Sequence, residues 1–129
     1  MKLLRGLRHG RWLADADEAI QRGEFDGAVE LVEAVLDSDG DNADALHLLG
    51  RIHLFRQEYD AADELYTRLR GMDPSDETAR ENLRQAHIRR GFQAREVGDL
   101  EATERHYRAA IEIDPGDAFV YYNLGCAYA

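Results

Sequence analysis

Five histidines and one cysteine are the side chains of this chain that could bind a transition metal or move a proton. They are His9, His47, His53, His87, His106 and Cys126. A metal site needs several ligands at a set spacing, such as two histidines four residues apart on one helix face. No histidine lies four residues from another histidine or from the cysteine, and the five are spread along the chain. The spacing therefore predicts core or surface histidines, with no metal site.

The acidic run from Asp37 to Asn42 is similar to part of a calcium-binding loop. Such a loop has its glycine at the sixth position and ends on a glutamate, whereas Gly40 is the fourth residue here and no glutamate closes the run. Cys126 has no neighbouring Lys or Arg to lower its thiol pKa, which indicates a small hydrophobic residue. Glycine-rich phosphate loops and nucleophile elbows are also missing from the sequence. We therefore predict no enzymatic activity, no metal and no cofactor.

The charge of the chain is strongly acidic and unevenly distributed. The net charge is -10, which argues against nucleic-acid binding because that depends on a cationic surface. Residues 1–14 carry four cations and no acid, so this +4 segment leaves -14 for the remainder. No apolar run approaches the roughly 20 residues of a membrane span. A single cysteine fits a reducing compartment, and we predict a cytoplasmic protein.

Small residues recur along the chain at a nearly fixed interval. Ala16, Gly50, Gly91 and Gly125 are 34, 41 and 34 residues apart. A period of 34 is the length of a helix–turn–helix unit that cannot bury its apolar face alone. Such units stack into a solenoid that offers extended surfaces to other proteins.

The repeat divides the chain into three units and a half. We expect units at about 9–42, 43–76 and 77–117, followed by a half-unit at 118–129, all in a single domain spanning 1–129. The third unit is longer by seven residues, which is almost two helical turns and nearly preserves the helix phase. We therefore predict one long helix from about Asp76 to Val97. An extension of the first helix is expected for the residues before position 9.

The three units share residue types at matching positions. These are Trp12, Ala16, Gly23, Phe25 and Ala28 in the first, Leu46, Leu49, Gly50, Tyr59, Ala62, Tyr66 and Pro74 in the second, and Gly91, Gly98, Tyr107, Ala110 and Pro115 in the third. This pattern resembles the tetratricopeptide repeat family, from about residue 9 to 129. Gly40, Val32, Thr103 and Leu69 depart from the family pattern. The resemblance implies an all-α solenoid of about seven helices in a right-handed superhelix.

The resemblance also implies where a partner binds, because the first helix of each family unit lines a concave groove. The matching residues here are Leu13, Asp17, His47, Arg51, Leu54, Phe55, Gln85, Ile88, Phe92, Arg95, Phe119 and Tyr122, with Ile20 and Cys126 beside them. We expect Arg51 and Arg95 to pair with a carboxylate on a peptide. Phe92, Phe119 and Tyr122 would form the walls of an apolar pocket, since interface cores favour aromatic residues and Arg.

Some family members hold a C-terminal carboxylate with Lys and Asn side chains on these helices. The corresponding positions here are Leu13, Asp17 and Leu48. That carboxylate clamp is therefore absent, and we do not expect this chain to bind chaperone tails.

The leading functional interpretation is an adaptor or scaffold for protein–protein interaction. One alternative is self-assembly into a homodimer through the C-terminal edge and the basic N-terminal segment, with that segment contacting the acidic body of a neighbouring copy. Another is a regulatory segment of a larger enzyme. The sequence does not identify the partner.

Overall fold

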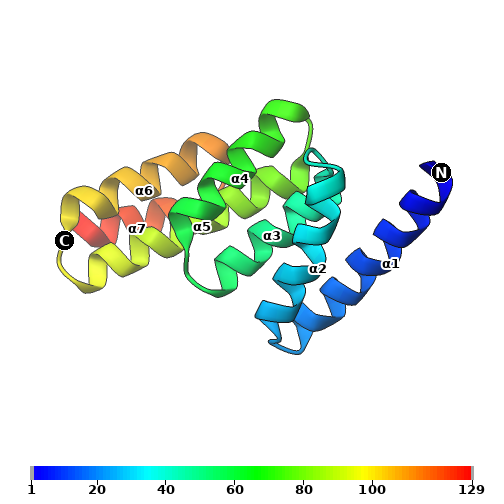
Figure 1. The fold of residues 1–129 in the computed structure, drawn as a ribbon. Coiled ribbons are helices and arrows are strands. Elements are labelled where there is room, and N and C mark those ends of the chain that lie inside the picture. Colours follow the sequence, from blue (N-terminus) through cyan, green and yellow to red (C-terminus); the bar gives the residue numbers. More distant parts are fainter. Residues whose placement is uncertain (1, 129) are drawn as a thin grey trace. The chain divides into compact units, whose positions relative to one another are not determined.

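The computed structural model describes the backbone of residues 2–128 and the side chains of residues 4–125, so the side chain of Cys126 lies outside the described residues. In this part the chain forms seven helices and no strand, which confirms the all-α prediction (Figure 1). The helices are α1 (Lys2–Gln21), α2 (Phe25–Ser38), α3 (Ala43–Phe55), α4 (Tyr59–Met72), α5 (Glu77–Glu96), α6 (Leu100–Ile113) and α7 (Ala118–Tyr128). They group into two compact units, Met1–Met72 with α1 to α4 and Asp73–Ala129 with α5 to α7.

The bounds of α5 agree closely with the long helix expected in the third unit. The Asp76 side chain accepts a hydrogen bond from the backbone N–H of Ala79 at 2.9 Å, which satisfies one of the free donors of the first turn. Val97 ends the helix just before Gly98. The seven extra residues thus lengthen a helix instead of forming a loop, and α1 likewise extends to Lys2 as expected.

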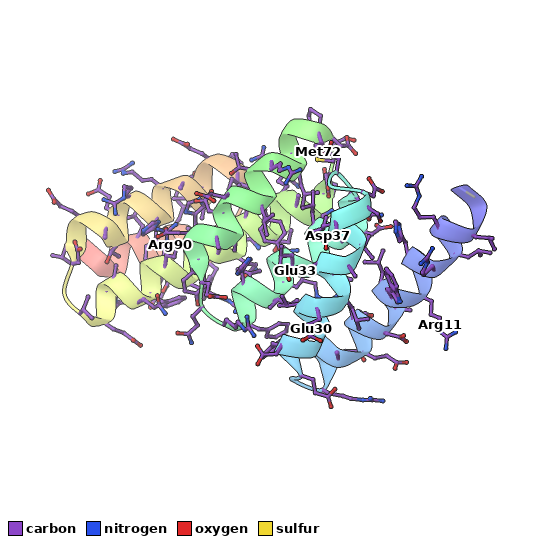
Figure 2. All side chains as sticks on the ribbon, viewed as in Figure 1. Arg11, Glu30, Glu33, Asp37, Met72 and Arg90 are labelled. Carbon is purple, nitrogen blue, oxygen red and sulfur yellow. The ribbon has the colours of Figure 1, made fainter. Side chains whose placement is uncertain are left out.

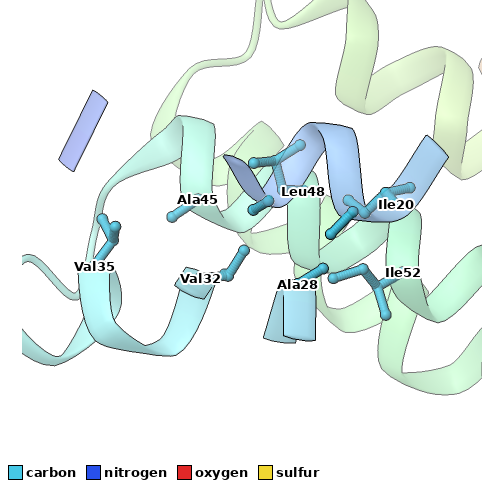
Figure 3. Packing of buried hydrophobic residues seen from close by; sticks show 9 residues of the cluster. Ile20, Ala28, Val32, Val35, Ala45, Leu48 and Ile52 are labelled. Carbon is cyan, nitrogen blue, oxygen red and sulfur yellow. The ribbon is translucent and has the colours of Figure 1, made fainter. Parts of the chain in front are cut away.

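Nine small and branched apolar residues form the core of the first unit. They are Ala16, Ala19, Ile20, Ala28, Val32, Val35, Ala45, Leu48 and Ile52. Figure 3 shows this cluster between α1, α2 and α3. Because six of the nine are Ala or Val, the three helices approach closely and each covers the apolar stripe of its neighbours.

A glycine and a tyrosine close each of two helical hairpins at the same place. A Cβ built on Gly50 would lie 2.6 Å from Cζ of Tyr66, and one built on Gly91 would lie 2.4 Å from Cε1 of Tyr107. Both tyrosines are 0% exposed, so the rings have no room to move away. The contact joins α3 to α4 and α5 to α6, and it fixes the distance between the paired helices.

Three turns between paired helices use the left-handed backbone region. Gly23, Gln57 and Gly98 have φ values of 77°, 61° and 80°. They share one repeat position, so the same turn geometry is formed twice by glycine and once by glutamine. For a residue other than glycine, this left-handed conformation costs about 1–2 kcal/mol. Gln57 is therefore a strained position in the α3–α4 turn.

Exchanging the residues of this turn should change stability in opposite directions. Gln57→Gly relieves the backbone strain and should raise the free energy of unfolding by about 0.5–1 kcal/mol, after the entropic cost of glycine. Gly98→Gln, the reverse change at the matching position, should lower it by about 1–2 kcal/mol. Urea denaturation followed by circular dichroism measures both, and equal signs for the two variants would contradict the assignment.

Adding one methyl group at the hairpin contacts should destabilise the protein. Gly50→Ala and Gly91→Ala each force a Cβ into a buried tyrosine ring, which should cost about 1–3 kcal/mol. The matched control is Gly71→Ala, an exposed position in α4 where a Cβ meets nothing within 4 Å. There the better helix propensity of alanine should leave stability unchanged or raise it by up to about 1 kcal/mol. Thermal unfolding in which all three variants behave alike would contradict this account.

Candidate binding site

In the first unit, α1 and α3 pack against each other and bring two predicted site residues together. Arg51 Nη1 donates to Asp17 Oδ1 at 2.7 Å, and the two side chains are 35% and 43% exposed. Gln21 donates to the other carboxylate oxygen of Asp17 at 3.3 Å. Arg51 therefore already has an acidic partner within the chain, and a carboxylate on a ligand would have to compete with Asp17.

The other candidate side chains in the first unit differ in how much of their surface is exposed to solvent. Leu54 is 9% exposed, and Leu13 is half-buried against the core cluster. The half-buried ring of His47 lies 6.4 Å from the ring of Tyr66 in α4. Phe55 differs, since it is 56% exposed and stacks on Phe25 at 5.7 Å. Of these four candidates, Phe55 offers an apolar surface to solvent, and the others serve mainly the packing of the unit.

The second unit gathers aromatic side chains from α5 and α7. The ring of Phe92 lies 6.3 Å from that of Phe119 and meets Tyr107 edge-on at 5.9 Å. Phe119 and Tyr122, one turn apart on α7, are 56% and 71% exposed. These three residues, Phe92, Phe119 and Tyr122, form what we call the aromatic face.

Arg95 stands one turn after Phe92 on α5, so an exposed cation is next to the aromatic face. Two further candidates on α5 have structural roles instead. Ile88 is 6% exposed and belongs to the core cluster of this unit. Gln85 is half-buried and donates to Glu81 at 3.1 Å.

Sequence reasoning missed Arg84, which joins α5 to the start of α7. Its side chain is 11% exposed and donates two hydrogen bonds, of 2.9 and 2.6 Å, to the carboxylate of Glu81. A third hydrogen bond runs from Arg84 to Asp117. Asp117 in turn accepts from the backbone N–H of Phe119 at 3.0 Å at the N-terminus of α7. This network therefore holds the start of α7 against α5, where Phe119 meets Phe92. The signal was in the sequence, since Arg84 follows Glu81 by one helical turn and precedes Asp117 by about one repeat.

The network perturbs the protonation of its members. The hydrogen bonds from Arg84 lower the pKa of Glu81, outweighing the opposing effect of its partial burial. The same hydrogen bonds to Glu81 raise the pKa of Arg84. Both groups are thus held in their charged forms.

Two histidines meet in the second unit. Nδ1 of His87 lies 3.3 Å from Nδ1 of His106, and the ring centroids are 5.6 Å apart. Spacing along one helix did not indicate this contact, because the α5–α6 hairpin brings together residues that are distant in the sequence. No group of three or more His, Cys, Asp or Glu side chains within the described residues is arranged to hold a metal ion.

Two other surface features lie on the first unit. A cavity of about 360 Å³ is lined by Arg5, Gly6, His9, Ser38 and Asp39, with His9 Nε2 2.7 Å from the Ser38 hydroxyl. Glu30, Glu33 and Asp37 form an exposed acidic row along α2 (Figure 2). None of the helices, over the residues the structure describes, has the length and apolar character of a membrane span.

The geometry described so far defines a helical repeat protein with exposed surfaces on the first helices of its hairpins. Models of the tetratricopeptide repeat match residues 19–91 and residues 106–129. The first match covers more than half of the chain, and the chain belongs to the tetratricopeptide repeat family. No curated protein matches the chain.

Several solved structures share the fold. The second TPR domain of human RPAP3, solved in complex with an HSP70 peptide, is 17% identical, with 97% of this chain and 98% of that chain covered and a TM-score of 0.62. A thermophilic TPR protein of Thermus thermophilus is 23% identical, with 93% and 64% covered and a TM-score of 0.61. The O-GlcNAc transferase of Thermobaculum terrenum is 25% identical with a TM-score of 0.62, covering 95% of this chain and 22% of the enzyme chain.

The Glu81–Arg84 contact should make stability depend on pH in the acid range. Because the pKa of Glu81 is lower in the folded state, its contribution is complete above the ordinary glutamate pKa of about 4.3 and is lost as pH falls through the folded value. Since Glu81 is about half exposed, we expect less than about 1 kcal/mol from it. Glu81→Gln should therefore flatten the loss of stability between pH 5 and pH 3, measured by urea denaturation. Glu64→Gln, an exposed site on α4, is the control and should keep the slope of the parent protein.

Proposed function

We propose that this chain is a non-enzymatic interaction module that binds a peptide or protein partner on the first helices of its repeats. The observation that supports this most is the aromatic face of α5 and α7. Phe119 and Tyr122 are largely exposed, and Phe92 packs against both Phe119 and Tyr107 of α6. Exposed aromatic residues on a rigid support are typical of interface hot spots.

The chemistry of this face indicates the kind of ligand. Aromatic rings offer apolar area to a Leu or aromatic anchor of a peptide, with little loss of side-chain freedom. Arg95 can form a charge-assisted hydrogen bond with a carboxylate one helical turn away. The proposed ligand is therefore a peptide segment with an apolar anchor close to an acidic residue. Arg51 remains a second candidate for pairing, in competition with Asp17.

The solved relatives support this mode of binding but not a particular partner. Two domains of the fold, 17% and 13% identical to this chain, are solved with an HSP70 peptide and an HSP90 peptide. Leu13, Asp17 and Leu48 stand where the resemblance places the residues of a carboxylate clamp. We therefore propose internal acidic–apolar segments as ligands in preference to chaperone tails, and a cytoplasmic location for the complex.

The basic N-terminal segment supports a different function, self-assembly. Leu4 and Leu7 are each 64% exposed on α1 beside exposed arginines, and the acidic row of α2 offers complementary charge on another copy. A third function, a regulatory segment of a larger enzyme, is supported by the similarity to part of the Thermobaculum terrenum enzyme, of which this chain covers 22%.

Selection from a random peptide library on phage, followed by fluorescence anisotropy with the enriched peptides, tests the proposal. Enriched peptides should share an apolar anchor and an acid. The double variant Phe119→Ala, Tyr122→Ala should weaken binding at least about tenfold, which corresponds to about 1.4 kcal/mol. Arg95→Gln should weaken it as well, and the remaining affinity should depend less on salt because the charge pair is lost.

The control is Leu100→Ala, which removes an equally exposed apolar side chain on α6, the second helix of its hairpin, and should leave affinity unchanged. Peptides that bind the double variant as tightly as the parent protein would show that the aromatic face is not the site. Failure to enrich any peptide would favour self-assembly over ligand binding.

A further inference from the structure

Two imidazole side chains face each other across the α5–α6 hairpin. Nδ1 of His87 lies 3.3 Å from Nδ1 of His106, and the planes of the two rings are inclined by 28°. His106 is 8% exposed, whereas His87 is half-buried and keeps contact with solvent. Two nitrogen atoms that can act as metal ligands are thus held close together, in a place that a dissolved ion can reach.

The distance between these nitrogen atoms matches the distance between two ligands of one metal ion. A tetrahedral ion with metal–nitrogen bonds of about 2.0–2.1 Å holds two of its ligand atoms about 3.3–3.4 Å apart. The same two atoms can also share a hydrogen, with the Nδ1–H of one ring donating to Nδ1 of the other. Metal binding replaces this hydrogen bond and requires both rings to carry their hydrogen on Nε2.

The packing of the hairpin fixes the two helices that carry these rings. Gly91 lies one turn after His87 on α5, and Tyr107 directly follows His106 on α6. A Cβ on Gly91 would lie 2.4 Å from the ring of Tyr107, and that ring is 0% exposed. The two ligands are therefore held in place by contacts that do not involve an ion, which lowers the entropic cost of binding one.

We propose that His87 and His106 bind one divalent transition-metal ion through their Nδ1 atoms, with water completing its coordination. Imidazole nitrogen suits Zn²⁺, Cu²⁺ and Ni²⁺, and Cu²⁺ has the highest affinity of the three for such ligands. No third His, Cys, Asp or Glu side chain in the part of the chain that the structure describes is placed to complete the set. The bound ion cross-links α5 to α6, and its site does not depend on the proposed peptide binding.

The number of ligands and the surrounding charge predict a moderate affinity. Structural zinc sites bind through four protein ligands, and this site supplies two. Arg84 and Arg90 each lie one turn from His87 on α5, so their positive charge opposes a cation. The net charge of the chain, -10, acts in the opposite direction by attracting cations. We expect a Kd for Zn²⁺ on the order of 10 µM, and tighter binding of Cu²⁺.

Isothermal titration calorimetry of the full chain, purified without a histidine tag and titrated with zinc chloride, tests the proposal. The titration should give one ion per chain. His87→Leu and His106→Leu should each weaken binding at least about tenfold, because losing even an outer partner of a metal ligand costs about 10–100-fold. Leu46 and Leu65 stand at the matching positions of the preceding hairpin, so leucine suits the packing there.

The matched control is His53→Gln, which should bind Zn²⁺ as the parent chain does. Nδ1 of His53 lies 3.1 Å from Glu58, so this pair is the alternative place for an ion to bind. Magnesium chloride should give no binding, because Mg²⁺ prefers oxygen ligands. In ¹⁵N NMR spectra, Zn²⁺ should shift the Nδ1 resonances of His87 and His106 more than their Nε2 resonances.

Three results would overturn the metal site. The first is no binding of Zn²⁺ or Cu²⁺ up to about 1 mM. The others are binding that either leucine variant leaves unchanged, and ring shifts that appear at Nε2 instead of Nδ1. Circular dichroism of each variant checks that the helices are retained. Excess Zn²⁺ should also raise the midpoint of thermal unfolding of the parent chain, and raise it less in the leucine variants.

Discussion

The close approach of glycine to tyrosine sets the geometry of both hairpins on which this structure depends. Gly50 and Gly91 leave no space for a Cβ, and the buried rings of Tyr66 and Tyr107 fill the gap. In the second hairpin the same kind of ring also supports the proposed binding surface, because Phe92, next to Gly91, meets Tyr107 edge-on. The glycine–tyrosine contact of the second hairpin and the aromatic face therefore share Tyr107. The Arg84 network holds α7, the second helix of that face, against α5.

Much of the fold could be predicted from the sequence because its signals are local and repeated. Glycines and prolines mark the turns, and Asp76 accepts a capping hydrogen bond at the predicted start of the long helix. The seven-residue insertion preserved the phase of the apolar stripe, which allowed α5 to be predicted as one helix. Gln57 shows the limit of this approach, because only the backbone reveals that a glutamine occupies a left-handed turn.

The contacts of the candidate site were less predictable, because they depend on which side chains the folded chain brings close together. Asp17 and Arg51 occupy the same position in successive repeats, so their proximity could be expected, but not that they would pair with each other. Arg84 was not among the predicted site residues, and the structure places it in an ion-pair network. His87 and His106 meet in the hairpin at positions where the preceding hairpin has Leu46 and Leu65. The contacts made at such positions depend on local packing, which the spacing of the repeat does not describe.

The glycine–tyrosine contacts also affect how the chain folds. Each joins residues only sixteen positions apart along the sequence, so closing a hairpin costs little loop entropy. Chains dominated by such local contacts fold quickly, and helical repeats can nucleate at more than one place. Each hairpin is therefore a kinetic unit that can form early, and the ion pairs that join residues a full repeat apart are expected to form after it.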